Sequence, residues 1–309
     1  MFTIRPAEPR DYDGIALIRN RMGPEQSTGA DLMREDEGTR RGQGAWVQRF
    51  VATADHGEMA GYVLAARFPW QRPDQAWIHV TVREGFRQQG AGHRLYEKAE
   101  GWARAQGAAS VHSACGDTPE VFLDWAANRG FTAVRHRAEW RLALDQWDDS
   151  RFEPILEQAR AQGFQLAMLP EVKCEAVMRS LYELMMQAQQ DEPGFDEVQP
   201  DYETWRKAYD DRPGLALALH EGKVVALSDL LLQRVKSEGC YFRLTGVRRE
   251  YRGRGLSLAV KVLALRAARL RAYPFAWTHN DVVNTPILRA NASLGLRRVP
   301  GYYELVKQF

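Results

Sequence analysis

Two arginine- and glycine-rich segments, each placed where a strand is expected to run into a helix, have the composition of phosphate-binding turns. They are "VREGFRQQGAGHRL" at 82–95 and "VRREYRGRGLSLAV" at 247–260. The first turn of a helix has backbone N–H groups without intrahelical partners and lies at the positive end of the helix dipole. Glycine there lets the backbone approach a ligand closely. Each segment therefore predicts a pyrophosphate site whose arginine side chains neutralise phosphate charge.

The residues predicted to form the two turns occupy matching places in the two segments. In the first segment they are Val82, Arg87, Gln88, Gln89, Gly90, Ala91 and Gly92, and in the second they are Val247, Arg252, Gly253, Arg254, Gly255, Leu256 and Ser257. A surface turn with solvated arginines is the alternative for a single copy, because short glycine motifs often arise by chance. Neither turn matches a dinucleotide fingerprint or a P-loop.

The two segments belong to an internal repeat with an offset of 247 − 82 = 165 residues. The same offset aligns "EMAGYVL" (58–64) with "KVVALSD" (223–229), and it aligns "NRGF" before residue 132 with "SLGL" before residue 297. We therefore expect one gap-free register over residues 58–131. Recurrence at equivalent positions favours the phosphate-binding interpretation. The expected division is an N-terminal domain at 1–145, a polar, helical linker at 146–163 and a C-terminal domain at 164–309.

Composition excludes several classes of protein. The 309 residues include 42 basic and 40 acidic side chains, a formal net charge of +2, which argues against a nucleic-acid partner. The only cysteines are Cys115, Cys174 and Cys240, so we expect neither a disulfide framework nor a metal site. No stretch approaches the roughly 18 apolar residues of a membrane span, and a membrane partner is not expected either. We expect a cytoplasmic protein.

The pattern around each turn indicates the fold. A β-type run precedes the turn, and an amphipathic helix follows it, with Leu95, Ala99 and Trp102 on one face in the first copy. Antiparallel strands at the front of each copy and a strand–helix–strand unit behind them predict an α/β fold of the α+β type, built on a mixed sheet.

The spacing V-x-x-x-x-R-x-x-G-x-G/A after a strand resembles the acyl-CoA-binding motif of the GNAT superfamily of N-acyltransferases. "VREGFRQQGAG" matches it fully, and in "VRREYRGRGLS" Ser257 replaces the last Gly/Ala. The segments "TGV" (245–247), "RGRGL" (252–256) and "THNDVVN" (278–284) also resemble the C-terminal repeat of tandem-GNAT proteins. The resemblance covers nearly the whole chain and implies two tandem GNAT-type acyltransferase domains.

The resemblance implies acetyl-CoA, or another acyl-CoA, as co-substrate between two splayed parallel strands. Its pyrophosphate would lie on the turns, and Asn284 would be a further cofactor-binding residue. The acceptor amine then attacks the thioester directly. Because an amine with a pKa near 10 is mostly protonated at neutral pH, a base or a chain of water molecules must take its proton. The backbone N–H of Val247 is the simplest donor to the developing oxyanion.

Comparison of the two copies points to the second as the catalyst. Asn280 aligns with Cys115, and Tyr241 aligns with Ala76. The second copy thus keeps polar groups where the first has mostly small or apolar ones, and the first copy either binds acyl-CoA structurally or has degenerated. Neither copy has the tyrosine acid or the glutamate base at the position usual in the family.

The candidate catalytic residues are Asp229, Tyr241 and His279. Asp229 is the first candidate for a base or an anchor of the acceptor ammonium, and a solvated strand-edge aspartate is the alternative. His279 has a suitable intrinsic pKa, although a histidine near a strand end is often a structural hydrogen-bonding group. Tyr241 could supply an acid, and a packing role is its alternative.

The leading hypothesis is an N-acetyltransferase that moves acetyl from acetyl-CoA to the primary amine of a small molecule in a ternary complex. The acidic, aromatic segment 189–214 suits a cationic amine, and a solvated helix packed by its aromatic residues explains it equally well. The alternatives are an acetyltransferase acting on a protein amine and a non-catalytic acyl-CoA-binding or sensing module. A homodimer is compatible with the sequence.

Overall fold

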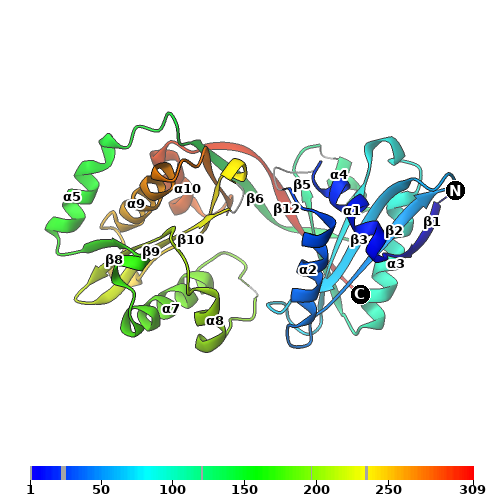
Figure 1. Cartoon of the computed structure of the whole chain (residues 1–309), viewed down its shortest axis with the longest axis horizontal. Coiled ribbons are helices and arrows are strands. Elements are labelled where there is room, and N and C mark those ends of the chain that lie inside the picture. Colours follow the sequence, from blue (N-terminus) through cyan, green and yellow to red (C-terminus); the bar gives the residue numbers. More distant parts are fainter. Residues whose placement is uncertain (1, 22–25, 120, 196, 234–235) are drawn as a thin grey trace. The chain divides into compact units, whose positions relative to one another are not determined.

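The chain folds into two α/β units, each with helices on both faces of a mixed sheet (Figure 1). The computed structural model describes residues 2–21, 26–119, 121–195, 197–233 and 236–309. Unit 1 comprises Met1–Arg135, Asp196–Val198 and Tyr303–Phe309, and unit 2 comprises His136–Phe195 and Gln199–Tyr302. The predicted α/β class, built on mixed sheets, is confirmed. In the part of the chain that the structure describes, no helix is both long enough and apolar enough to span a membrane.

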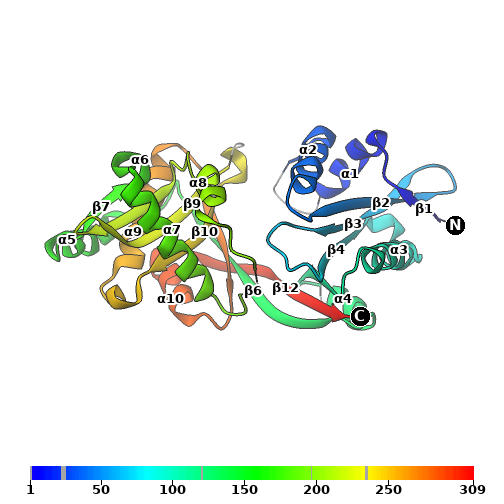
Figure 2. The ribbon, with the colours of Figure 1, turned by 90° about the horizontal axis from the view of Figure 1, so that it is seen from below.

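Unit 1 has the strand order β1-β2-β3-β4-β5-β12. Its first five strands are β1 (Phe2–Pro6), β2 (Trp46–Ala54), β3 (Met59–Arg67), β4 (Gln75–Val82) and β5 (Ser110–Gly116). Its helices are α1 (Tyr12–Arg19), α2 (Gly29–Arg40), α3 (Ala91–Ala105) and α4 (Val121–Ala127). Figure 2 shows the strands between α3 on one side and α1 with α2 on the other. The predicted apolar face of α3 is buried at Leu95 and Ala99.

Unit 2 has the strand order β6-β11-β10-β9-β8-β7. Its strands are β6 (Thr132–Ala143), β7 (Gln165–Met168), β8 (Leu215–His220), β9 (Lys223–Leu232), β10 (Cys240–Val247) and β11 (Phe275–Asp281). Its helices are α5 (Glu153–Ala161), α6 (Leu169–Val172), α7 (Glu175–Gln190), α8 (Tyr202–Ala208), α9 (Leu256–Leu270) and α10 (Thr285–Leu294). Helix α9 packs on one face of the sheet, and α7 with α8 covers the other (Figure 1).

Each of the two parallel strand pairs, β4–β5 and β10–β11, is hydrogen-bonded only at one end in the described residues. Among the described residues, β10 pairs with β11 at Cys240↔Ala276 and Tyr241↔Trp277. In unit 1, β4 pairs with β5 from Gln75↔Ser110 to Trp77↔His112. Beyond these pairs the strands separate toward the turn that follows the first strand of each pair, so each unit has a V-shaped opening in its sheet.

The last strand of each repeat lies in the other unit. From His136 onward β6 belongs to unit 2, where it runs antiparallel to β11. The end of β12 (Arg297–Gln308) belongs to unit 1, where the N–H of Phe309 donates to the Ala109 carbonyl at 2.9 Å. The compact units therefore have bounds different from 1–145 and 164–309, which stay a prediction for the repeats.

The segment expected to be a linker packs as part of unit 2. Trp147, Phe152 and Leu156 are buried in the core that α9 shares with the sheet. The helix expected in this segment is α5, and it packs on α9. The apolar residues among its charged neighbours thus serve unit 2 and do not merely connect the repeats.

The expected gap-free register between the repeats is wrong within β10. A β-bulge between Phe242 and Leu244 places one extra residue, Arg243, in this strand. Tyr241 lies opposite Trp277 as Trp77 lies opposite His112, so Tyr241 matches Trp77 and not Ala76. A bulge adds one residue to one strand and leaves the pairing on both sides intact. The offset is therefore 241 − 77 = 164 before the bulge and 244 − 79 = 165 after it.

Candidate functional site

A cavity of about 410 Å³ occupies the V-shaped opening of unit 2. It extends from the end of β10 and the turn before α9 to β11 and the start of α10. Of the predicted cofactor-binding residues, its wall includes Val247, Arg252, Gly253, Gly255, Leu256, Ser257 and Asn284. Charged residues that sequence reasoning did not single out also line it: Asp191, Glu192, Arg243 and Lys261. The structure therefore brings the predicted turn residues of the second copy together at one site.

The turn before α9 depends on two glycines. Gly253 has φ +79° and Gly255 has φ +77°, both in the left-handed region that favours glycine. Gly255 is the N-cap of α9, and because glycine has no side chain the cap residue accepts no side-chain hydrogen bond from the first helical turn. The N–H groups of that turn therefore stay available to an anion. Arg254 is not among the described residues of the wall, and its guanidinium lies 5.4 Å from the Tyr251 ring centroid.

The arginines of this turn are already paired with a carboxylate. Arg252 Nε donates to the Val247 carbonyl at 3.2 Å, and its Nη2 bonds Asp191 at the end of α7. Arg249 Nη2 donates to the same carboxylate at 2.5 Å. The hydrogen bond from Arg249 lowers the pKa of Asp191, and Arg252 lowers it further. A phosphate that binds at this turn would share these guanidinium groups with Asp191.

His279 forms an acid–base pair with Glu139 at the cavity wall. Its Nε2 lies 3.3 Å from Glu139 Oε2, and the two residues are cross-strand neighbours on β11 and β6. Burial raises the pKa of Glu139, but hydrogen bonds from His279 and Arg141 outweigh burial and lower it overall. The imidazole also stands edge-on to the Tyr302 ring at 4.9 Å. The carboxylate therefore orients a histidine that faces the cavity.

Two asparagines after β11 have different surroundings. Asn280 Oδ1 accepts a hydrogen bond of 2.7 Å from Asn291, which is fully buried on α10. Asn284 stands at the N-cap of α10, yet its side chain makes no capping hydrogen bond there. Both asparagines line the cavity. Asn284 therefore does not cap α10, and a ligand amide or hydroxyl is the natural partner for its side chain.

Asp229 and Tyr241 are not among the described residues that line the cavity. The Asp229 carboxylate is fully buried on β9 and accepts hydrogen bonds from Arg243 Nε at 2.9 Å and Tyr209 OH at 3.2 Å. Burial raises the pKa of Asp229 to about 6, although Arg212 acts to lower it. Tyr241 packs against Trp277 with ring centroids 4.6 Å apart, and burial raises its pKa.

Three of the four aromatic residues of segment 189–214 pack in or against the core of unit 2. Trp205 and Tyr209 are each 3% exposed and stack at 4.5 Å. Tyr202 continues the stack against Trp205. The packing interpretation of these aromatic residues is therefore the better one, and the acidic contribution to the cavity comes from Asp191 and Glu192.

The turn of the first copy has the same backbone with different side chains. Gly90 is the N-cap of α3 with φ +88°, and Gln88 has φ +59° where the second copy has Gly253. Arg87 Nε donates to the Val82 carbonyl at 3.2 Å, as Arg252 does to Val247. A Cβ on Gly92 would lie 3.8 Å from Trp125, whose counterpart in unit 2 is Ala290. Of the remaining predicted residues, Gln89 donates a hydrogen bond to the Gly85 carbonyl, and Ala91 packs in the core.

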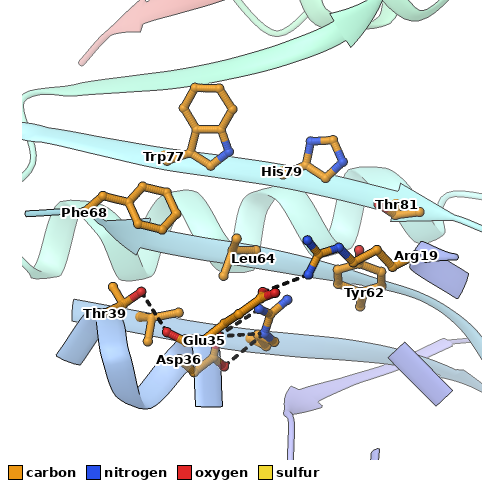
Figure 3. Close-up of a pocket in the computed structure, with 12 residues that line it drawn as sticks. Arg19, Glu35, Asp36, Thr39, Tyr62, Leu64, Phe68, Trp77, His79 and Thr81 are labelled. Carbon is orange, nitrogen blue, oxygen red and sulfur yellow. Dashed lines mark hydrogen bonds and ion pairs between the residues drawn. The ribbon is translucent and has the colours of Figure 1, made fainter. Parts of the chain in front are cut away.

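A second cavity, of about 270 Å³, lies in unit 1 on the face covered by α1 and α2. Figure 3 shows Trp77 and His79 projecting from β4 to the same side, with Tyr62 and Leu64 on the neighbouring strand. A buried ion pair between Arg49 and Asp36, with the charged atoms 2.8 Å apart, forms part of the cavity wall. Burial lowers the pKa of His79, and Arg19 and Arg49 lower it further. The alternation Trp77-x-His79-x-Thr81 is the sequence signal that points to this cavity.

Comparison with known proteins connects the geometry to a family. Residues 16–131 match the sequence profile of the Acetyltransferase (GNAT) family. A GCN5-related N-acetyltransferase from Sphaerobacter thermophilus is similar over 99% of this chain and 95% of its own, with a TM-score of 0.74 and 20% identity. A tandem GNAT protein from the clavulanic acid biosynthesis pathway is similar over 100% and 98%, with a TM-score of 0.71 and 18% identity. No match was found among curated protein sequences.

Proposed function

We propose that this chain, which belongs to the GNAT acetyltransferase family, transfers acetyl from acetyl-CoA to the primary amine of a small molecule, with the chemistry in unit 2. The observation that carries the proposal is the single cavity that joins the turn at Gly253–Gly255 to the His279–Glu139 pair. One end of it suits an anionic diphosphate, and the other presents a group that can accept a proton.

The residues of unit 2 fit an acyl-CoA. The uncapped first turn of α9 and the Arg252 guanidinium suit the pyrophosphate. Where β10 and β11 separate, the free edge of β10 toward Val247 suits the amides of an extended pantetheine chain. Asn284 adds an amide without a capping partner on the opposite wall. When bound, the co-substrate supplies a thioester carbon that an amine can attack.

We assign His279 as the proton acceptor of the reaction. Its imidazole reaches the cavity, and Glu139 holds the ring from the neighbouring strand. A positioned base is typically worth ~10²–10⁴ in rate. The backbone N–H of Val247 is the proposed donor to the oxyanion. Asp191 and Glu192 supply negative charge on the wall, which favours a cationic acceptor.

We assign Asp229 and Tyr241 to supporting roles. The Asp229 carboxylate accepts hydrogen bonds from Arg243 and Tyr209, so it does not face the cavity. Its role is to position the Arg243 side chain, which lines the cavity. Tyr241 supports the Trp277 ring, which packs at 5.5 Å from His279. Neither residue then contacts the reacting atoms.

Thiol release over a broad panel of amines, with acetyl-CoA as donor, tests the proposal. The matched variants are Gly255→Glu and Gly90→Glu, since both positions have φ near +80° and neither Cβ would meet an atom within 3.5 Å. Glutamate adds the same backbone strain in both units and places negative charge at a turn proposed to bind phosphate only in unit 2.

We expect turnover to be lost in Gly255→Glu and kept in Gly90→Glu. Silence of the wild type across the panel, with acetyl-CoA still bound, would favour the sensing module. Turnover with peptides alone would favour a protein acceptor. Loss of turnover in Gly90→Glu alone would place the chemistry in unit 1.

A further inference from the structure

The cavity of unit 2 contains a buried lysine without an acidic partner. Lys261 on α9 lines the cavity and is 1% exposed. Its Nζ lies 3.8 Å from the centroid of the Phe242 ring. Within the described part of the chain, no carboxylate or other side chain forms a hydrogen bond or an ion pair with this ammonium. A buried lysine is normally paired, because removal of its charge from water is costly.

Lys261 lies at the closed end of the cavity. Ser257 and Lys261 are four residues apart and share one face of α9, so the lysine continues the wall one helical turn below the phosphate-binding turn. Its contact, Phe242, follows the last β10–β11 pair, and Thr278 Oγ1 donates to the Phe242 carbonyl at 3.0 Å. From Phe242 to Val247 the strand advances by four steps of its partner β9 (Leu230 to Ala226), about 14 Å, because the bulge at Arg243 adds a residue without adding a step. That length suits an extended pantetheine chain with its acyl group at Lys261.

The electrostatics of the closed end favour an incoming negative charge. The charged or titratable residues of the wall are Asp191, Glu192, Arg243, Tyr251, Arg252 and His279. Asp191 is bound by Arg249 and Arg252, and His279 faces Glu139. Burial alone lowers the pKa of Lys261 to about 7, so no neighbouring charge compensates its cation.

We propose that the cavity selects an acyl-CoA whose acyl group ends in a carboxylate, as in the monothioester of a dicarboxylic acid, and that the Lys261 ammonium binds this carboxylate. The proposal rests on the acyl-CoA-binding function proposed above and names its preferred donor class. Acetyl-CoA still binds, because the lysine can lose its proton when no carboxylate is present. In unit 1 the matching residue is Tyr96, whose hydroxyl accepts a hydrogen bond from Lys307 at 3.1 Å, so the matching position of unit 1 does not carry a cation.

Two thioether analogues that differ in one group test this selection. They are S-(3-carboxypropyl)-CoA and its neutral amide, S-(3-carbamoylpropyl)-CoA, titrated calorimetrically into the full chain with acetyl-CoA alongside. Wild type should bind the carboxylate ~10-fold or more tightly than the amide, as expected for a desolvated charge pair. Lys261→Met should remove this ratio and leave the affinity for the amide within ~3-fold. Lys223→Met, an exposed lysine outside the cavity wall, is the control.

The pH dependence of wild type alone provides a second measurement. Because burial lowers the pKa of Lys261 to about 7, part of the Lys261 population is unprotonated at neutral pH, so binding of the carboxylate analogue should be accompanied by proton uptake. Calorimetry in two buffers of different ionisation enthalpy measures this uptake. The ratio of affinities for the carboxylate and amide analogues should be larger at pH 6 than at pH 9, because at pH 9 the lysine must first gain a proton.

The outcomes separate this inference from the proposed function. Equal affinities for the two analogues, or a preference that survives in Lys261→Met, would overturn the selection of a carboxylate. Binding of acetyl-CoA without binding of either analogue would overturn it too, since the closed end would then be too short. If acetyl-CoA itself failed to bind, the proposed function would fall first and this inference with it.

Discussion

The two V-shaped openings of this protein have the same backbone and different contents. In unit 1, Trp125 on α4 packs over the turn, contacts Tyr96 at 5.9 Å between ring centroids and carries Arg129 stacked at 3.8 Å. In unit 2 the matching residue is Ala290, which lines an open cavity. A single aromatic side chain thus stands in one copy where the other has a small residue on the cavity wall.

Two further differences between the copies also leave polar groups facing the opening only in unit 2. His279 matches Ala114, so the imidazole proposed to accept the proton has no counterpart in the first copy. Lys261 matches Tyr96, whose polar group is bonded by Lys307. The two copies thus share the glycine turn, and the proposed function depends on a few side chains that face the opening of unit 2.

Replacement of His279 should have the largest effect on this comparison. His279→Gln should lower kcat by ~10²–10³, the usual contribution of a positioned base, and leave the KM for acetyl-CoA within ~2-fold. Steady-state kinetics with the best amine of the panel measures both. His56→Gln, at an exposed histidine of unit 1, is the control. A kcat within ~2-fold of wild type would exclude His279 as the proton acceptor.

Transfer of the tryptophan to unit 2 should close its cavity. Ala290→Trp should weaken acetyl-CoA binding ~100-fold, because the indole takes space on the wall that the ligand needs. Ala292→Trp, at an exposed position of the same helix, should bind like wild type. Calorimetric titration of the three proteins decides the matter, and unchanged affinity in Ala290→Trp would show that the ligand binds elsewhere.

The reciprocal change in unit 1 should have a smaller effect. Trp125→Ala should lower the free energy of unfolding by about 2 kcal/mol, since it removes a half-buried indole. It should also create a second, weaker acetyl-CoA site, visible as a stoichiometry between one and two. Addition of Gly90→Glu should abolish that site. A stoichiometry of one in Trp125→Ala would mean that unit 1 lost acyl-CoA binding for further reasons.

The smallest effect concerns the backbone of the first turn. Gln88 adopts φ +59°, where its counterpart is Gly253, and this conformation costs a non-glycine residue about 1 kcal/mol. Gln88→Gly should therefore raise the free energy of unfolding by about 0.5 kcal/mol after the entropy of the added glycine is subtracted. Chemical denaturation followed in unit 1 measures it. A loss of stability would show that the Gln88 side chain makes a compensating contact.

Local features could be predicted from the sequence. The strand–turn–helix around Arg252 and Gly255, the apolar face of α3 and the α/β class all depend on residues close together in the chain, and each is present. The repeat also identified unit 2 as the more polar copy. Register was less predictable, since a bulge at Arg243 adds a residue that no local pattern announces.

The amino-acid sequence by itself determined the two glycine turns, because left-handed φ values and an uncapped helix start are properties of a few consecutive residues. Only the tertiary structure decided which side chains meet there. Glu139 lies next to His279 because β6 pairs with β11, although the two residues are 140 positions apart in the sequence. In unit 1, Trp125 lies near Gly92 at the start of α3, beside side chains of β4. The unpaired state of Lys261 depends on every element around it, since a charge is buried or compensated only by its neighbours in space.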